Sequence, residues 1–317
     1  MFPSHPASLT RFMYDLMIIG GGPAGITAGI YAARQKLNTL LITKDFGGQV
    51  NNKAVAVENY PGFEKISGLE LIQRFENHLK KQEIEIKIDE VAKIEKKTGN
   101  FLIITKNKQE IESRAVIVAS GGDPRPLEVP GEKEFAGRGV SYCVLCDGPF
   151  FKDKPVAVIG GGNAGFEAAI FLSNIAKKIY ILENSPQIRA FADNQEKIKK
   201  TGKTEIIINA ALKEIKGDKF VKSIIYQDMI TKELKTLEVK GIFVEIGTQP
   251  ATSFVKDLVD FNERDEIKVD FETFQTKTPG LFAAGDVNLG KYKQIVTAAG
   301  EGAKAALAAY DYLQKLS

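Results

Sequence analysis

The chain has only two cysteines and two histidines among its 317 residues. A structural zinc site takes four Cys or His ligands, and His5 and His78 lie far apart, so we expect no metal site. Neither histidine stands near a serine or cysteine nucleophile motif, which argues against a Ser-His-Asp triad. Two cysteines cannot form the disulfide framework of a small secreted domain. These absences favour a reduced, cytoplasmic protein whose two thiols act as a catalytic pair.

Long hydrophobic runs and an excess of one charge are also absent. No apolar stretch approaches the ~20 residues that span a bilayer, and the opening MFPSHPASLTRF lacks the pattern of a signal peptide. The formal net charge is +3, and Lys and Glu alternate along the chain. The most basic run, at residues 197–203, fits a helix end and a solvated loop. We therefore expect neither a membrane nor a nucleic-acid partner, and the length predicts two domains.

Glycine is concentrated in two similar segments, YDLMIIGGGPAGITAGIYAARQKLNTLLIT and KPVAVIGGGNAGFEAAIFLSNIAKKIYILE. Each reads as a strand, a GxGxxG turn, a helix with small residues and a second strand. The first glycine allows the tight turn, the second admits a pyrophosphate to the backbone, and the third lets helix and strand pack closely. The chain is thus predicted to bind two dinucleotides, whereas a single glycine-rich turn would be weak evidence.

An acid at the end of the second strand of such a unit bonds a ribose hydroxyl. In the second segment this residue is Glu183, which favours a free 2′-hydroxyl and hence NADH over NADPH. Arg189 would partly offset the repulsion of a 2′-phosphate, and the alternative interpretation of Glu183 is a solvated strand end. After the first segment come Lys44 and Asp45, and neither is assigned a role.

The two cysteines form a CxxC motif, Cys143 and Cys146, followed at once by Asp147. This spacing is compatible with a redox pair, half of a metal site or two buried structural residues. The redox interpretation gains from Asp147, because an acid beside an opened disulfide can protonate the departing thiolate. A helix start near the motif would also lower a thiol pKa.

Together the motifs GGGPAG, GGQV, ENYPG, VIVASGG, CVLCDGPFF, GGGNAG, IFVEIGTQP, LFAAGD and YKQIVTAAGEGAKAAL occur in the order and at the spacing of a known family. From about Tyr14 onward the chain resembles the low-molecular-weight thioredoxin reductases. The resemblance implies an α/β fold with two Rossmann-like, three-layer ββα domains. An FAD domain (1–122 and 251–317) would receive an inserted NAD(P)H domain (123–250) that carries the CxxC. It also implies a homodimer and a domain rotation that alternates the partner of the flavin.

The resemblance further assigns residues. Cys146 would exchange electrons with the flavin, Cys143 would exchange with the protein substrate, and Asp147 would be the acid. Lys293 would add positive charge near the flavin pyrimidine, at the start of the last helix. The implied FAD contacts are Gly20, Gly22, Pro23, Ala24, Gly25, Gly48, Gln49, Asn59, Val91, Ala119, Gly121, Gly285, Asp286, Lys293, Gln294 and Ile295. The implied NAD(P)H contacts are Gly160, Gly162, Asn163, Ala164, Glu183, Arg189 and Gly247.

Two departures from the family pattern matter. NADPH-dependent members carry HRRxxxR where this chain has ENSPQIR, which is similar to the NADH-preferring flavoprotein of alkyl hydroperoxide reductase. The other departure, GGGNAG in place of GGGxSA, keeps a small residue at Gly165. The flavoprotein of alkyl hydroperoxide reductase has an extra N-terminal redox domain, for which this chain is expected to have no room. We therefore expect a separate thioredoxin- or glutaredoxin-like substrate. The alternatives are a ferredoxin-dependent reductase, an NADH oxidase and a non-enzymatic flavin redox sensor.

Overall fold

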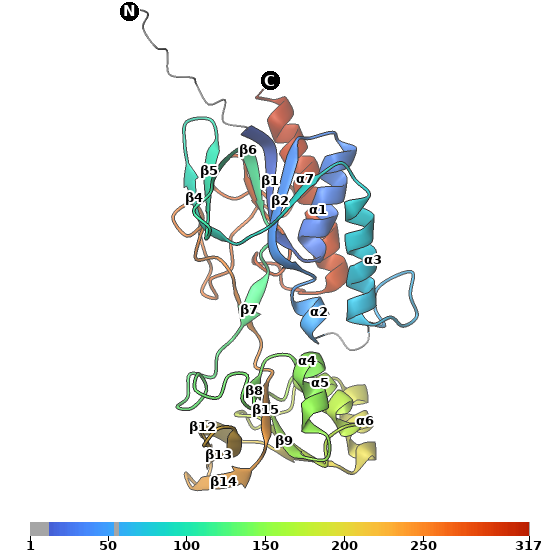
Figure 1. Ribbon diagram of the computed structural model, residues 1–317, viewed down its shortest axis with the longest axis vertical. Coiled ribbons are helices and arrows are strands. Elements are labelled where there is room, and N and C mark those ends of the chain that lie inside the picture. Colours follow the sequence, from blue (N-terminus) through green and yellow to red (C-terminus); the bar gives the residue numbers. More distant parts are fainter. Residues whose placement is uncertain (1–12, 54–56, 317) are drawn as a thin grey trace, which may run out of the picture. The chain divides into compact units, whose positions relative to one another are not determined.

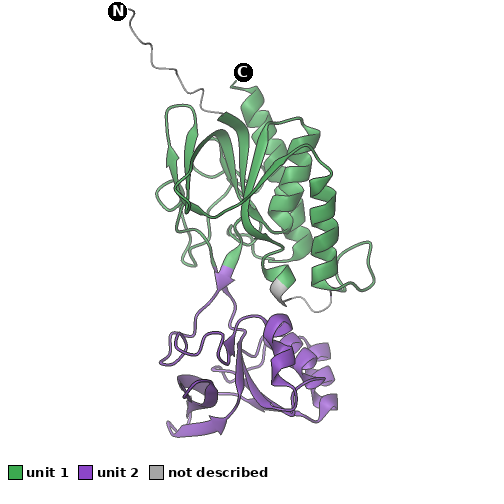
Figure 2. Cartoon of the chain, in the orientation of Figure 1, with its two compact units in different colours: residues 1–51, 58–122, 250–317 green, residues 52–57, 123–249 purple. Residues whose placement is uncertain are grey.

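The computed structural model describes residues 13–53 and 57–316, and these residues divide into two compact units (Figure 2). Unit 1 comprises residues 1–51, 58–122 and 250–317, and unit 2 comprises residues 52–57 and 123–249. The division differs from the predicted domain bounds at Pro250 and at residues 52–57. The N-terminal segment and His5, on which two expectations rest, lie outside the described residues.

Unit 1 is built on a seven-stranded sheet in the order β3-β2-β1-β6-β5-β4, with β17 also paired to β6. β6 has two neighbours on one side: β5 pairs antiparallel with its first half, and β17 pairs parallel with its second half. The chain end thus returns to complete the first sheet. The strands are β1 (Met13–Gly21), β2 (Thr39–Phe46), β3 (Glu85–Ile88), β4 (Val91–Lys96), β5 (Phe101–Thr105), β6 (Glu110–Val118) and β17 (Leu281–Ala283).

Alternation along β1 explains the three layers of unit 1, because successive side chains of a strand point to opposite faces. Leu16 and Ile18 are buried among residues of the helices, while Met17 and Ile19 are buried among residues of β4, β5 and the segment after Pro250. On the helical face, α1 packs against both α7 and α3 (Figure 1). The helices of unit 1 are α1 (Pro23–Arg34), α2 (Gln49–Lys53), α3 (Gly68–Lys80) and α7 (Ile295–Gln314).

Unit 2 repeats this plan around a five-stranded parallel sheet in the order β11-β10-β9-β15-β8. Val156 and Val158 of β9 face the helices, whereas Ala157 and Ile159 face a three-stranded antiparallel sheet, β12-β13-β14. The strands are β8 (Val140–Ser141), β9 (Pro155–Ile159), β10 (Lys178–Leu182), β11 (Thr204–Ile207), β12 (Ala210–Gly217), β13 (Val221–Asp228), β14 (Leu234–Glu238) and β15 (Gly241–Val244). The helices are α4 (Val144–Asp147), the 3₁₀ helix η1 (Gly148–Phe151), α5 (Asn163–Ser173) and α6 (Ala192–Thr201).

The predicted α/β class with two three-layer ββα domains is therefore confirmed. The two segments that follow the strands ending in VIVAS and IFVEI contain short strands, β7 (Gly122–Pro124) and β16 (Thr248–Pro250), which pair with each other. Of the helices that the structure describes, none is long and apolar enough to cross a membrane. Within residues 13–53 and 57–316, no group of three or more His, Cys, Asp or Glu is arranged to hold a metal ion.

Candidate functional site

The first glycine fingerprint forms a tight turn between β1 and α1. Gly20 has φ +117°, and a Cβ there would lie 2.2 Å from the carbonyl oxygen of Ala119. A Cβ at Gly25 would lie 1.9 Å from the Gly20 carbonyl oxygen, so helix and strand touch at this point. A Cβ at Gly22, by contrast, would have no atom within 4 Å. The three glycines thus play the separate parts that their spacing predicts: a turn, an open approach and a close packing contact.

The N-terminus of α1 is available to an anion. Gly22 is the N-cap residue and makes no side-chain cap, and Pro23 takes the first helical position. Backbone N–H groups in the first turn of a helix point away from its body, and the helix dipole favours negative charge there. The open space beside Gly22 at this helix end fits a pyrophosphate.

Residues that are remote in sequence meet at the carboxyl ends of the neighbouring strands β1, β6 and β17. Ala119 follows β6, and its N–H donates to Ile19 at 2.8 Å; Ala284 follows β17, and its N–H donates to Val118 at 2.9 Å. Gly285 comes next, and a Cβ at this position would lie 3.0 Å from the Cβ of Ala24. The structure therefore places these predicted FAD residues at one edge of the sheet, where ligands of such folds bind.

Two further predicted FAD glycines, Gly48 and Gly121, have positive φ angles of +51° and +63°, and a Cβ at either would meet nothing within 4 Å. The Gly47 N–H donates to the Gly21 carbonyl at 2.8 Å, which ties the GGQV turn to the first fingerprint. Gln49 begins α2 and is half-buried, and Val91 is buried at the start of β4. The backbone is thus open at Gly48 and Gly121, whereas Val91 contributes to the core.

Asp286 presents a carboxylate that matches a hydroxylated ligand. It follows Gly285, and burial raises its pKa, while the charge of Lys293 acts in the opposite direction. Within residues 13–53 and 57–316, no group donates a hydrogen bond to this carboxylate. A mostly buried carboxylate without a donor is costly unless a ligand supplies one. The ribityl hydroxyls of a flavin are donors of this kind, so the residues present fit FAD.

The start of α7 is tied to the ENYPG loop. The Asn59 amide donates to the Gln294 side-chain oxygen at 3.0 Å. Gln294 is also the N-cap of α7 and forms a capping box with Thr297, just before Ile295. The structure therefore brings together Asn59 and Gln294, two predicted FAD contacts that lie 235 positions apart.

Lys293, which is expected to add positive charge near the flavin, is bound by several groups of unit 1. Its ammonium donates to the carbonyl oxygens of Asp286, at 3.1 Å, and of Asn288, and it forms an ion pair with Glu266 at 3.1 Å. Its charge is thus partly neutralised within the protein. We therefore interpret Lys293 first as a residue that supports the turn after β17.

The second fingerprint, in unit 2, has the same geometry as the first. Gly160 has φ +123°, and a Cβ there would lie 2.3 Å from the Glu245 carbonyl oxygen. A Cβ at Gly165 would lie 2.0 Å from the Gly160 carbonyl oxygen, and one at Gly162 would have no atom within 4 Å. Gly162 caps α5 without a side-chain bond. Gly247, at φ +94°, is equally open and lies beyond the carboxyl end of β15.

Glu183 lies at the carboxyl end of β10, as predicted. Its carboxylate accepts the Gly161 N–H at 2.7 Å and the Ser185 N–H at 2.8 Å. Burial raises its pKa, but the N–H groups of Ser185 and Gly161, and the charge of Arg189, lower the pKa overall. The carboxylate is thus ionised and fixed beside the fingerprint, which a solvated strand end would not require.

The loop after Glu183 folds over the start of α5. The Arg189 N–H donates to the Gly161 carbonyl at 3.0 Å, and the Asn163 side chain accepts the Phe191 N–H at 2.7 Å. Both Arg189 and Ala164 are exposed. All seven residues of the predicted NAD(P)H set thus lie in the loops that follow strands of the unit 2 sheet or, for Asn163 and Ala164, in the first turn of α5.

The equivalent position of unit 1, inside β2, carries a hydroxyl in place of an acid. Ile19 pairs with Ile42 in unit 1 as Ile159 pairs with Leu182 in unit 2, so Thr43 occupies the position of Glu183. The Thr43 hydroxyl donates to the Asp45 carbonyl at 2.5 Å. Lys44 and Asp45, to which the sequence assigns no role, are exposed in the second half of β2.

Cys143 and Cys146 form a disulfide with a Cα–Cα distance of 5.3 Å. Cys143 is the N-cap of α4, and its Sγ accepts the Cys146 N–H at 3.2 Å. Cys146 is exposed, whereas Cys143 and Asp147 are half-buried. The metal interpretation is not supported by the described residues, and the exposure of Cys146 does not fit two buried structural cysteines.

A second network beside the disulfide was not foreseen from the sequence. Glu132 is 4% exposed and accepts the N–H groups of Leu127, at 2.6 Å, and Glu128, at 2.8 Å. It also accepts the hydroxyl of Tyr142, the residue before Cys143. Burial, and then the bond to Glu132, raise the pKa of Tyr142. Spacing gives no signal for this cluster, because its members follow no strand or helix period.

Glu301 of α7 was also missed. Its carboxylate accepts the Gly285 N–H and the Asn288 side-chain amide, each at 2.7 Å. The only sequence signal is an acid on the helix face that otherwise carries Ala298, Gly302 and Ala305 toward the core.

Comparisons with known proteins agree with this geometry. Residues 14–302 match the family described as "Pyridine nucleotide-disulphide oxidoreductase". The chain is 41% identical over 312 residues to a subunit of the alkyl hydroperoxide reductase of Pseudomonas aeruginosa, covering 97% of this chain and 60% of that protein. It is 41% identical over 300 residues to "NADH dehydrogenase" of Bacillus subtilis, covering 95% of this chain and 58% of that protein. The chain thus spans about 60% of the length of these curated relatives.

A solved structure covers nearly the whole of both chains. The thioredoxin reductase of Lactococcus lactis aligns with a TM-score of 0.91 and 38% identity, over 95% of this chain and 99% of that one. The likeness therefore extends to both units and is not limited to the glycine fingerprints.

Proposed function

Because the chain belongs to the pyridine nucleotide-disulphide oxidoreductase family, we propose that it is a thioredoxin-reductase-like flavoenzyme. It moves electrons from NADH, in preference to NADPH, through FAD and the Cys143–Cys146 disulfide to a thioredoxin- or glutaredoxin-like protein. The family supports FAD and a nicotinamide nucleotide as the cofactors. FAD is assigned to unit 1 and the nicotinamide nucleotide to unit 2.

The observation that carries this proposal is the disulfide in the unit that also holds the second glycine fingerprint. A disulfide in a nucleotide-binding unit, with one exposed cysteine, is better suited to electron transfer than to structural cross-linking. Reduction of this disulfide takes up two electrons and two protons and leaves two thiols. Thiol–disulfide exchange with a substrate disulfide then passes both electrons and both protons to the substrate. FAD, when bound, supplies the step that accepts a hydride and releases two electrons singly or as a pair.

The two cysteines have different surroundings, which supports different roles. The Cys146 N–H that donates to the Cys143 sulfur would stabilise a thiolate at Cys143, and a thiolate is the attacking form. Cys143 is therefore assigned the exchange with the protein substrate, and Cys146 the exchange with the flavin. Asp147, next in the chain and half-buried, is assigned the proton transfer.

The preference for NADH is supported by Glu183. An ionised carboxylate at the end of β10 accepts a bond from a ribose 2′-hydroxyl and repels a 2′-phosphate. The name of the Bacillus subtilis relative also specifies NADH. The exposed Arg189 would weaken the repulsion without replacing the missing arginines.

The acceptor is supported by the name of a solved neighbour. The Lactococcus lactis structure is named a thioredoxin reductase, whereas the Pseudomonas aeruginosa relative is named for alkyl hydroperoxide reduction. A small redoxin that presents an exposed disulfide fits the first name. The homodimer and the cytoplasmic location expected from the sequence remain predictions.

Anaerobic stopped-flow mixing with NADH and, separately, NADPH tests the donor through the flavin band near 450 nm. We expect fast bleaching by NADH and little by NADPH. Bleaching by neither would favour a ferredoxin donor, and vigorous oxygen uptake without a redoxin would favour an oxidase. Steady turnover with a thioredoxin or a glutaredoxin would exclude a passive sensor, and its loss in Cys143→Ser and Cys146→Ser would assign it to the disulfide.

A further inference from the structure

The turn between β17 and α7, from Ala284 to Gly290, is held by two side chains of opposite charge. Lys293 donates to the carbonyl oxygens of Asp286 and Asn288. One oxygen of Glu301 accepts both the Gly285 N–H and the Asn288 amide, each at 2.7 Å. Two carbonyl groups of the turn are thus bound by the lysine, and one backbone N–H and one side-chain amide are bound by the glutamate.

The Asn288 side chain connects Glu301 to the far end of the turn by hydrogen bonds. It is 0% exposed, and its side-chain oxygen accepts the Gly290 N–H at 2.7 Å. Gly285, at the near end, has φ +81° and lies against Ala24 at the start of α1. Glu301 therefore binds the near end of the turn directly and its far end through Asn288, and Asp286 lies between these two points.

The position of Glu301 is unfavourable for an acid unless the turn requires it. Burial raises its pKa, the Gly285 N–H, Asn288 and Lys293 lower it, and the charge of Asp286 raises it again. An apolar residue would suit the alanine-rich face of α7 at lower cost in desolvation. What the carboxylate adds is an acceptor for the Gly285 N–H and a second acceptor for the Asn288 amide, which also donates to the Ala283 carbonyl at 3.3 Å.

We propose that Glu301 is a positioning residue for the FAD site: by holding the 284–290 turn, it keeps the Asp286 carboxylate ready for the ribityl hydroxyls. The inference rests on the proposed function only in that unit 1 takes FAD. Glu301 does not touch the cofactor in this scheme, and acts through the turn.

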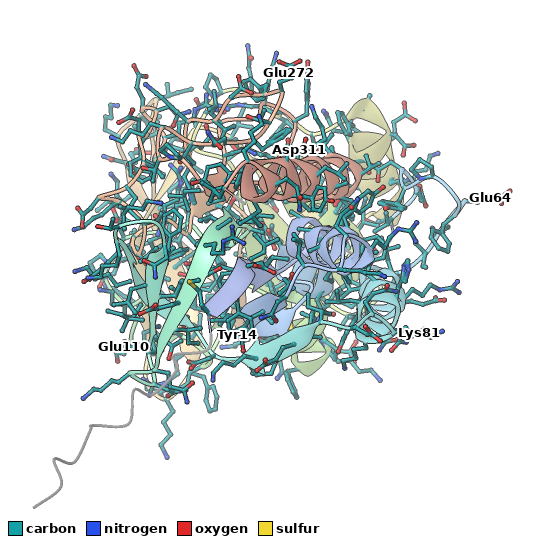
Figure 3. The ribbon with its side chains drawn as sticks, turned by 90° about the horizontal axis from the view of Figure 1, so that it is seen from above. Tyr14, Glu64, Lys81, Glu110, Glu272 and Asp311 are labelled. Carbon is teal, nitrogen blue, oxygen red and sulfur yellow. A yellow bond between two sulfur atoms is a disulfide. The ribbon has the colours of Figure 1, made fainter. Side chains whose placement is uncertain are left out.

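The test compares four variants of the full chain. Glu301→Gln keeps an acceptor oxygen and removes the charge. Glu301→Met keeps the volume and removes the acceptor, and Glu301→Ala removes both. Asp311→Ala is the matched control, since Asp311 is the other acid of α7 and is exposed (Figure 3).

The first readout is FAD affinity, measured by titrating the FAD-stripped full chain and following the flavin fluorescence. Glu301→Met and Glu301→Ala should bind FAD at least about tenfold more weakly, the change expected when one charge-assisted hydrogen bond to the turn is lost. Glu301→Gln should restore affinity to within about threefold, and Asp311→Ala should match the parent.

The second readout needs no cofactor. Hydrogen exchange of the Gly285 amide in the FAD-free chain should be at least about tenfold faster in Glu301→Met and Glu301→Ala, and unchanged in Glu301→Gln and Asp311→Ala. If either folded variant without an acceptor binds FAD like the parent, or protects the Gly285 amide like the parent, the positioning role is wrong. A parent chain that takes no FAD would instead overturn the proposed function, while the exchange comparison would still judge the turn.

Discussion

Replacing Glu183 tests stability and donor choice at once. Glu183→Ala removes the acceptor of two backbone N–H groups, those of Gly161 and Ser185. Hydrogen bonds to charged groups contribute about 1.5–3 kcal/mol each, and a half-exposed carboxylate belongs at or below the lower end because solvent screens it. We expect the free energy of unfolding to fall by about 2 kcal/mol at neutral pH. Glu183→Gln, with one acceptor oxygen, should lose about half as much.

The pH dependence of this effect follows from the sign of the shift. The pKa of Glu183 is lowered in the folded chain, so its contribution is present above the unfolded pKa and is lost as the pH falls through the folded pKa. The difference between the parent and Glu183→Gln should therefore shrink in acid. Urea unfolding at neutral and acid pH measures it, with the exposed Glu196→Gln of the same unit as the control.

A further variant at the same position tests the preference between NADH and NADPH. Glu183→Arg should shift the ratio of flavin reduction rates by NADH and NADPH toward NADPH, because it replaces repulsion of a 2′-phosphate by attraction. Unchanged stability in Glu183→Ala together with an unchanged donor ratio in Glu183→Arg would refute the reasoning and return Glu183 to the solvated surface.

Three other outcomes are expected. Cys146→Ser should leave flavin reduction by NADH intact and abolish redoxin reduction, and normal turnover in this variant would contradict the assigned electron path. Glu132→Ala should lower the free energy of unfolding by about 3 kcal/mol, since three donors lose their buried acceptor, as measured by urea unfolding against the exposed control Glu134→Ala. Asp286→Asn should stabilise the FAD-free chain at neutral pH but not below about pH 4. The pKa of Asp286 is raised in the folded chain, so the stability that this group contributes below its unfolded pKa is lost as the pH rises through its folded pKa. Thermal unfolding at both pH values measures the effect, and an equal effect at both would contradict the assignment.

Local patterns were sufficient where the structure depends on neighbours in sequence. The strand-glycine-helix segments predicted the parallel strand pairs β1–β2 and β9–β10, because the turn, the open approach and the close packing are each set by single glycines such as Gly20, Gly22 and Gly25. The start of α7 near Gln294 was likewise evident, since the capping residues and the helix adjoin.

The missed features depend on contacts between distant segments. Glu301 meets Gly285 only because β17 and α7 fold back on α1, and nothing in either segment alone requires an acid. Lys293 was expected to present its charge to the flavin, but Glu266, from the segment before β17, pairs with it. In both cases the partner that decides the role lies outside the motif that drew attention to the residue.

The two units also separate what a fingerprint can specify from what it cannot. Their glycine turns agree to within a few tenths of an ångström in the approach of Gly25 to Gly20 and of Gly165 to Gly160. That geometry is made by backbone and serves any pyrophosphate. The residues at the equivalent positions of the two units differ: the Glu183 carboxylate accepts two backbone N–H groups, whereas Thr43 donates its hydroxyl to a neighbouring carbonyl and carries no charge. We therefore expect discrimination between nucleotides to come from the side chain at this position and from Arg189, and not from the glycine turn; of the two equivalent positions, only that of unit 2 carries a carboxylate.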